Sequence, residues 1–183
     1  TSGKNSGGIG GLSQGAVAGA VTITNSGAVM TTGDQSFGIS AQSLGEQSSG
    51  LVKVTNTSNI MTNGENANAL EARSVISDRK PTQSRFMAST RSVYLSNFLA
   101  VPSNGSAGNV VVNQTGNLVA TGAGSSAIYA QSTGANNGNI DITVEAGSTL
   151  IGGAAGGSGV SLIGGAQNTL VNRGIITAMG NTV

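Results

Sequence analysis

The sequence predicts an all-β protein, a parallel β-helix (solenoid) of about five to six rungs with roughly 30 residues in each rung. Three observations lead to this prediction. A short motif returns at a nearly constant interval, no helical pattern separates the repeated strands, and the residues are small. Of the 183 residues, 30 are glycine and only 3% are aromatic, so the chain has too few large side chains for a bulky globular core.

The repeated motif spans seven positions, with apolar residues at the first and seventh places, Asn or Gln at the third and usually Gly at the fifth. Clear copies begin at positions 23, 54, 112 and 170, and a looser copy with one added residue begins at 142. The starts of successive copies therefore differ by 31, 58, 30 and 28 in sequence number. Because 58 is close to two periods, we expect one copy to be missing or disguised.

Each motif predicts a strand, a turn and a second strand, because short apolar alternation is bounded by Asn and Gly. A third apolar segment follows at 37–42 and 127–131, and more faintly at 160–163. A loop rich in Gly, Ser and Asn, such as 134–138, closes the unit. Three strands per rung place equivalent residues above one another in successive rungs.

The third place of the motif is a column of amide side chains: Asn25, Asn56, Gln114 and Asn172. Either turn propensity alone explains this column, or the amides form a hydrogen-bonded ladder between rungs. Possible hairpin turns at 63–64 and 104–105 suggest an antiparallel sandwich as a rival fold. The fixed register of the repeat favours the β-helix.

Residues 71–105 interrupt the repeat within what we expect to be a single β-helix fragment spanning 1–183. The segment contains five of the eight basic residues, three of the five aromatic residues and both prolines. Three interpretations stay open: an irregular rung with a long loop, an excursion from the rod, or a short helix from about 84 to 99.

The interruption also supplies the candidate partner-binding residues, which combine positive charge with aromatic rings. These residues are Arg79, Lys80, Arg85, Arg91, Phe86, Tyr94 and Phe98. Such side chains suit contact with an acidic protein surface, a sulfated glycan or a second copy of the chain. The alternative is a tolerated insertion whose rings pack against the flank of the rod. Nucleic acid is not an expected partner, because the net charge is only +1.

Composition limits the chemistry, because the chain contains neither Cys nor His. Thiol nucleophiles, disulfides and Ser–His–Asp catalysis are therefore excluded. The best carboxylate pair is Asp34 and Glu65, which follow the same glycine column and are expected to stack on adjacent rungs, as solvated turn residues. Asp141 and Glu145 are expected to face different surroundings. We predict no catalytic residue, metal site or cofactor, and the chain is not expected to be an enzyme.

Four segments carry a resemblance to a known family: 25–29, 38–45, 127–134 and 168–176. They resemble passenger repeats of bacterial monomeric (type V) autotransporters, and are similar to large adhesins of the Brucella and rhizobial type. The resemblance covers roughly 1–70 and 106–183. It implies a right-handed β-helix that is exported through a C-terminal barrel and displayed at the outer membrane of the bacterial cell surface.

The functional expectation is therefore a cell-surface adhesin module, a virulence-type rod whose loops bind host extracellular-matrix or cell-surface proteins, or a sulfated glycan. A passive spacer of a larger autotransporter is the alternative, and a polysaccharide-cleaving β-helix enzyme is less favoured. The chain starts and stops within the pattern, so we interpret it as a fragment without barrel or signal, linked to a membrane only through that missing barrel. Open strand edges also predict end-to-end self-association.

Overall fold

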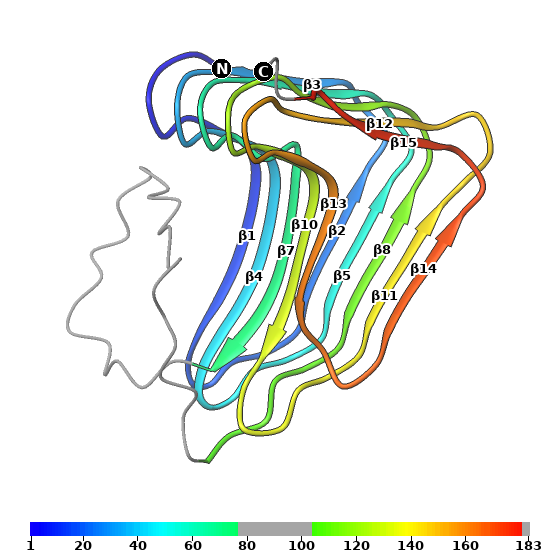
Figure 1. Cartoon of the computed structure of the whole chain (residues 1–183). Coiled ribbons are helices and arrows are strands. Elements are labelled where there is room, and N and C mark those ends of the chain that lie inside the picture. Colours follow the sequence, from blue (N-terminus) through cyan, green and yellow to red (C-terminus); the bar gives the residue numbers. More distant parts are fainter. Residues whose placement is uncertain (77–103, 181–183) are drawn as a thin grey trace.

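The computed structural model describes residues 1–76 and 104–180. Within these ranges every helix or strand is a β-strand, and the strands form three parallel sheets of five strands each (Figure 1). Successive strands visit the three sheets in turn, so one strand of each sheet makes one rung. Five strands per sheet correspond to about four turns of a β-solenoid. This count differs slightly from the five to six rungs that the sequence predicts.

The strands are best listed sheet by sheet. The first sheet contains β1 (Gly7–Val17), β4 (Phe37–Ser48), β7 (Leu70–Ile76), β10 (Ser126–Thr133) and β13 (Ser158–Gly164). The second contains β2 (Val21–Asn25), β5 (Val52–Asn56), β8 (Val110–Gln114), β11 (Ile140–Val144) and β14 (Asn168–Asn172). The third contains β3 (Val29–Thr32), β6 (Ile60–Asn63), β9 (Leu118–Ala120), β12 (Thr149–Gly152) and β15 (Ile175–Ala178).

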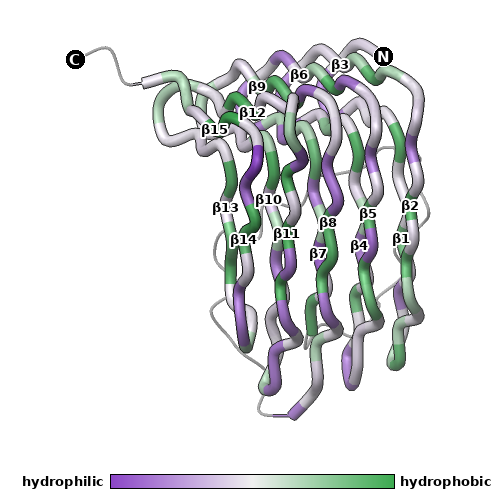
Figure 2. Tube along the Cα trace, turned by 90° about the vertical axis from the view of Figure 1, so that its right-hand side faces the viewer, coloured by the Kyte–Doolittle hydropathy of each residue, from purple (hydrophilic) through white to green (hydrophobic). Residues whose placement is uncertain are grey.

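The coil is right-handed. In Figure 1 the chain runs down the first sheet, up the second and back across the third, which is an anticlockwise path. Figure 2, viewed from the right-hand side of Figure 1, shows that successive rungs advance toward the viewer of Figure 1. This is the hand that parallel strand crossovers almost always take.

The pairing register confirms the columns that the motif predicts. Ile23 pairs with Val54, and Val112 pairs with both Val54 and Ile142. The seventh place of the motif forms a second column, in which Leu118 lies between Ile60 and Leu150. Because every strand pair within the sheets is parallel, the antiparallel sandwich is wrong.

The long interval between the second and third clear copies of the motif does not contain a second rung. Val54 and Val112 are direct partners in adjacent strands, so the expected missing copy does not exist. Residues 77–103 are instead inserted between β7 and β8 of one rung. The sequence boundary at 71 is also wrong, because β7 pairs in regular register with β4 and β10.

The core is a narrow column of aliphatic side chains enclosed by the three sheets. Ile39, Leu70 and Ile128 stack from the first sheet and are fully buried. Hydrophobic and hydrophilic residues alternate along the strands in Figure 2, as expected for strands with one face inside. Burying one such aliphatic side chain contributes about 1.5–3 kcal/mol, and large rings are not needed to fill so thin an interior.

Candidate functional site

An amide ladder runs through the interior of the rod, as one of the two interpretations predicts. Asn25 Nδ2 donates to Asn56 Oδ1 at 2.7 Å, and Asn56 Nδ2 donates to Gln114 Oε1 at 3.1 Å. Asn25 is 7% exposed, and Asn56 and Gln114 are fully buried. Each amide also binds the turn after its own strand, as when Asn56 Nδ2 donates to the Ser58 carbonyl at 2.7 Å. The column therefore joins the rungs and holds their turns.

Asn172 does not join this ladder, contrary to the sequence prediction. Val144 lies between Gln114 and Asn172 in the column, and its aliphatic side chain has no hydrogen bond to offer. Asn172 is exposed on the last described rung, where its Oδ1 accepts a hydrogen bond from the Gly174 backbone at 3.0 Å. The turn role applies to this residue, but the ladder role does not.

A second polar column, made of serines, was missed by the sequence analysis. Ser43, Ser74 and Ser132 lie at equivalent places of β4, β7 and β10. Ser74 Oγ accepts from the Gly108 amide at 2.8 Å and donates to the Gly50 carbonyl of the preceding rung at 2.9 Å. Ser43 and Ser132 make the same two bonds to their own glycines. This column fastens the corner between the first and second sheets.

Glycine is required at that corner because consecutive rungs approach closely. A Cβ atom on Gly108 would overlap the backbone of Gly50, and one on Gly138 would overlap the backbone of Gly108. The serines therefore bind a corner that only glycine can form.

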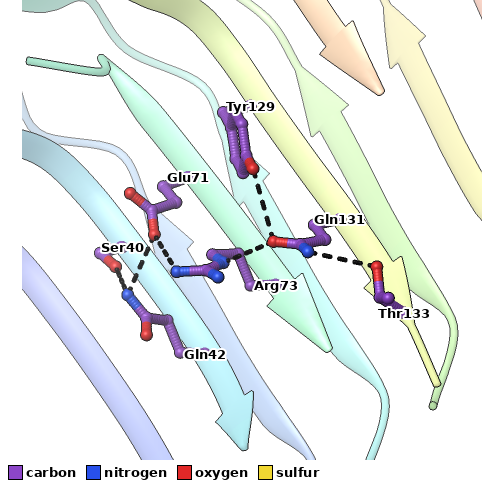
Figure 3. A network of polar contacts seen from close by, with 7 residues as sticks. All are labelled: Ser40, Gln42, Glu71, Arg73, Tyr129, Gln131 and Thr133. Carbon is purple, nitrogen blue, oxygen red and sulfur yellow. Dashed lines mark hydrogen bonds and ion pairs between the residues drawn. The ribbon is translucent and has the colours of Figure 1, made fainter. Parts of the chain in front are cut away.

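A polar network covers the outward face of the first sheet, across β4, β7 and β10 (Figure 3). Its centre is the ion pair between Arg73 Nη1 and Glu71 Oε1, at 3.5 Å. On one side, Gln42 Nε2 donates to Glu71 Oε1 at 3.1 Å. On the other side, Arg73 Nε donates to Gln131 Oε1 at 2.9 Å. The network thus joins three successive rungs through side chains.

Three further side chains complete this network. Gln42 Nε2 also donates to Ser40 Oγ, and Gln131 Nε2 donates to Thr133 Oγ1. The Tyr129 hydroxyl donates to Gln131 Oε1 at 3.4 Å. Burial raises the pKa of Tyr129 above its usual value, Arg73 partly opposes this rise, and Glu71 adds to it. The phenol therefore stays protonated and can act as a donor throughout the neutral range.

The ion pair is unusual because both charges are buried on the outward face of a sheet. The side chains of Arg73 and Glu71 are only 8% and 5% exposed. Charges removed from water are tolerated when they are paired and hydrogen-bonded, and the amides on either side supply those bonds. Glu71 and Arg73 therefore pair with each other and form hydrogen bonds to the two neighbouring rungs, through Gln42 and Gln131.

A sequence signal for the place of β7 did exist. Residues 70–74 read Leu-Glu-Ala-Arg-Ser, where 39–43 read Ile-Ser-Ala-Gln-Ser and 128–132 read Ile-Tyr-Ala-Gln-Ser. The apolar residue, the alanine and the serine repeat, while the two outward positions carry charges in β7. Because the sequence analysis used these charges to mark the start of the interruption, it missed the repeated apolar residue, alanine and serine of β7.

The insertion leaves the rod at one corner and returns to the same corner. Gly105 lies against Ile76, since a Cβ added to Gly105 would be 2.9 Å from Ile76 Cγ2. The Ala107 amide then donates to the Asn136 carbonyl at 2.8 Å, which restores the ordinary rung contact. Residues 77–103 therefore begin and end at neighbouring points of the rod.

All seven candidate partner-binding residues lie outside the described residues. They are Arg79, Lys80, Arg85, Arg91, Phe86, Tyr94 and Phe98. The structure describes only the residues that flank this segment, Ile76 before it and Asn104 after it.

The expected stacking of Asp34 and Glu65 on adjacent rungs is present, and both residues are exposed. The Glu65 amide donates to Asp34 Oδ1 at 3.0 Å, so this carboxylate binds the turn of the next rung. Glu145 faces a different partner, Arg173 Nη1, at 3.1 Å in an exposed ion pair. Within residues 1–76 and 104–180, no three acidic side chains are grouped as a metal site would require. The same residues include no helix long and apolar enough to span a bilayer.

The fold and these polar columns define the class of protein, a parallel β-helix with internal ladders and one insertion. Comparisons with protein-family models, with curated proteins and with solved structures each found no match.

Proposed function

We propose that the chain is a cell-surface adhesin module, a β-helical rod that presents residues 77–103 to a host matrix protein, a cell-surface protein or a sulfated glycan. One observation carries the proposal: strand pairing passes without a break across the insertion, from Val54 to Val112. The rod therefore accommodates a long, compositionally distinct segment without losing a rung. A scaffold that displays a binding segment needs this property.

The distribution of charge supports the same role. Residues 77–103 carry four basic residues and one acidic residue, a net charge of +3. The rest of the chain carries four basic and six acidic residues, a net charge of −2. A positive segment on a weakly negative rod suits an anionic partner, because the attraction is concentrated at one place.

The resemblance to autotransporter passengers supports a location at the bacterial outer membrane. In this proposal the rod is held there by a C-terminal barrel that lies outside the chain. The role requires binding alone, so no catalytic step is assigned to any residue.

The test compares binding of the chain and of an Arg79/Lys80/Arg85/Arg91→Ala variant to immobilised heparin and to matrix proteins. We expect the variant to lose about tenfold or more in affinity, with a weaker salt dependence for the residual binding. A Lys4/Lys53→Ala variant is the control, because it removes basic residues from the rod. Equal binding by the chain and the fourfold variant, or no binding by either, would remove the proposal.

The second candidate is a passive spacer, which the amide and serine columns favour because each joins several successive rungs and so stiffens the rod. In this case the ligand site lies elsewhere in the parent protein. Deleting residues 78–91 from that parent would then leave adhesion unchanged, whereas the adhesin proposal expects adhesion to fall.

A further inference from the structure

Two Asn-Gly pairs of the rod share the same dipeptide but have different surroundings. Asn63 ends β6 and is followed by Gly64, whereas Asn137 and Gly138 lie in the link from β10 to β11. Strand β6 pairs with β3 on one side and with β9 on the other, so this pair belongs to an inner rung of the stack. A third Asn-Gly pair, at 104–105, borders the residues outside the described ranges.

An asparagine that precedes glycine is open to attack by the backbone, because glycine has no Cβ atom to hinder the approach. The glycine amide nitrogen bonds to the asparagine Cγ atom, and its proton passes through water to the departing Nδ2 group. The Cγ–Nδ2 bond breaks, ammonia leaves, and a five-membered succinimide remains. Water then opens the ring to aspartate or to isoaspartate. The reaction therefore requires a glycine amide that is free to act as the nucleophile.

The surroundings of Asn63 favour this reaction. Its side chain is exposed, and the Thr121 hydroxyl of the next rung donates to Asn63 Oδ1 at 3.2 Å. A donor at this oxygen stabilises the negative charge that develops there when the carbonyl is attacked. Within residues 1–76 and 104–180 the Gly64 amide donates no hydrogen bond, although the equivalent Gly33 amide donates to the Asn63 carbonyl at 2.7 Å. The nucleophile is therefore free.

The surroundings of Asn137 oppose the same reaction. The Gly138 amide donates to Ser132 Oγ at 2.9 Å, as part of the serine column. Asn137 Oδ1 accepts a hydrogen bond from the Gly134 amide at 2.8 Å, which ties the side chain back across its own loop. Both asparagines thus have a donor at Oδ1, and the two pairs differ in whether the glycine amide is engaged.

We propose that Asn63 is a site of spontaneous deamidation in the folded protein, with the Gly64 amide as nucleophile and the Thr121 hydroxyl stabilising the attacked carbonyl. Asn137 is protected in the same molecule, because Ser132 engages the Gly138 amide. Neither site involves residues 77–103, so the reaction is independent of ligand binding by that segment.

The product changes an inner rung in two ways. Either product adds a negative charge near the exposed carboxylates Asp34 and Glu65. Isoaspartate also adds one carbon atom to the backbone, beside a column of glycines in which even a Cβ atom on Gly64 would overlap the backbone of Gly33. We therefore expect the deamidated fraction to unfold at a lower temperature than the unmodified chain.

Mass spectrometry of peptides tests the proposal after incubation of the folded chain in mildly alkaline buffer. Replacement of NH2 by OH marks deamidation, and we expect it at Asn63 at least several-fold faster than at Asn137. In urea the two sites should react at similar rates, because the dipeptide is the same. A folded chain in which Asn63 reacts no faster than Asn137, or a difference that persists in urea, would overturn the proposal.

Substitutions of the neighbouring hydroxyls provide a second test. Thr121→Val should slow the reaction at Asn63 several-fold, and Thr121→Ser, which keeps the hydroxyl, should restore most of the rate. Ser132→Ala should speed the reaction at Asn137 several-fold while leaving Asn63 unchanged, with circular dichroism as the check that each variant folds. Equal rates at Asn63 in the valine and serine variants would overturn the role of Thr121. An unchanged rate at Asn137 in folded Ser132→Ala would overturn the protection.

Discussion

Asn56 shows how this protein keeps polar groups in a thin interior without exposing them to water. Its amide is fully buried, yet it joins Asn25, Gln114 and its own turn in hydrogen bonds. Buried polar groups are expensive only when they lack such bonds. The ladder therefore replaces solvent for the turns of three rungs.

Replacing Asn56 by alanine should lower the free energy of unfolding by about 2–4 kcal/mol, because the substitution leaves neighbouring buried groups without a bond. Urea unfolding measures the change. Asn172→Ala is the matched control at an exposed place of the same column, and it should stay within about 0.5 kcal/mol of the parent chain. Similar losses for both variants would contradict a stabilising ladder.

The pair Glu71–Arg73 can be tested against the pattern of its own neighbours. Arg73→Gln alone should cost about 3–5 kcal/mol, because it leaves the buried Glu71 carboxylate without its cation. Combining it with Glu71→Ser recreates the Ser-x-Gln arrangement of β4, and most of the lost stability should return. A double-mutant cycle from urea unfolding gives the coupling, and additive losses would show that the two side chains act independently.

At the scale of the element, β7 is an ordinary strand followed by a long connection. The link from β10 to β11 uses residues 134–139. Removal of 77–103 would leave residues 104–109 as the link from β7 to β8, which is the same length. The backbone of this short link already bonds to the next rung, through Ala107 and Asn136.

A variant lacking 77–103 should therefore fold with its strand content intact. Shortening the connection favours the folded state by about 1–2 kcal/mol through loop-closure entropy. Far-ultraviolet circular dichroism and thermal unfolding measure both expectations. Loss of the β-sheet spectrum would show that the inserted segment is needed to form the rod.

At the scale of the whole molecule, the protein is a one-dimensional stack in which each rung contacts only its neighbours. A central rung is covered on both sides, whereas the last described rung is covered on one. Stability in such stacks depends on the intrinsic stability of each rung and on its interfaces with its neighbours.

Amide hydrogen exchange should follow this order along the rod. The amides of β5 and β8 should exchange slowest, because their rungs have neighbours on both sides. The amides of β14 and β15 should exchange fastest, because these edge strands can open locally without unfolding of the whole rod. Uniform protection in dilute solution would contradict a stack that opens from its end.

The repeat in the sequence predicted the columns well because stacking requires like residues at like places. Ile23, Val54, Val112 and Ile142 align in the structure as they align in the motif. The prediction was wrong where it used the number of residues between two copies of the motif to infer how many rungs separate them. The long interval between Val54 and Val112 suggested two rungs, but an insertion closes at one corner and adds no height.

The sequence alone determined the parallel β-helix, because a regular repeat of small aliphatic and amide positions has few other ways to bury its columns. Only the tertiary structure decided which neighbours those positions meet. It placed Val144 as the break in the amide ladder, revealed the serine column, and paired Glu71 with Arg73 on the outward face. The ladder and the outward network join residues that lie far apart in the chain, such as Asn56 with Gln114 and Arg73 with Gln131, and these contacts become visible only when the rungs are stacked.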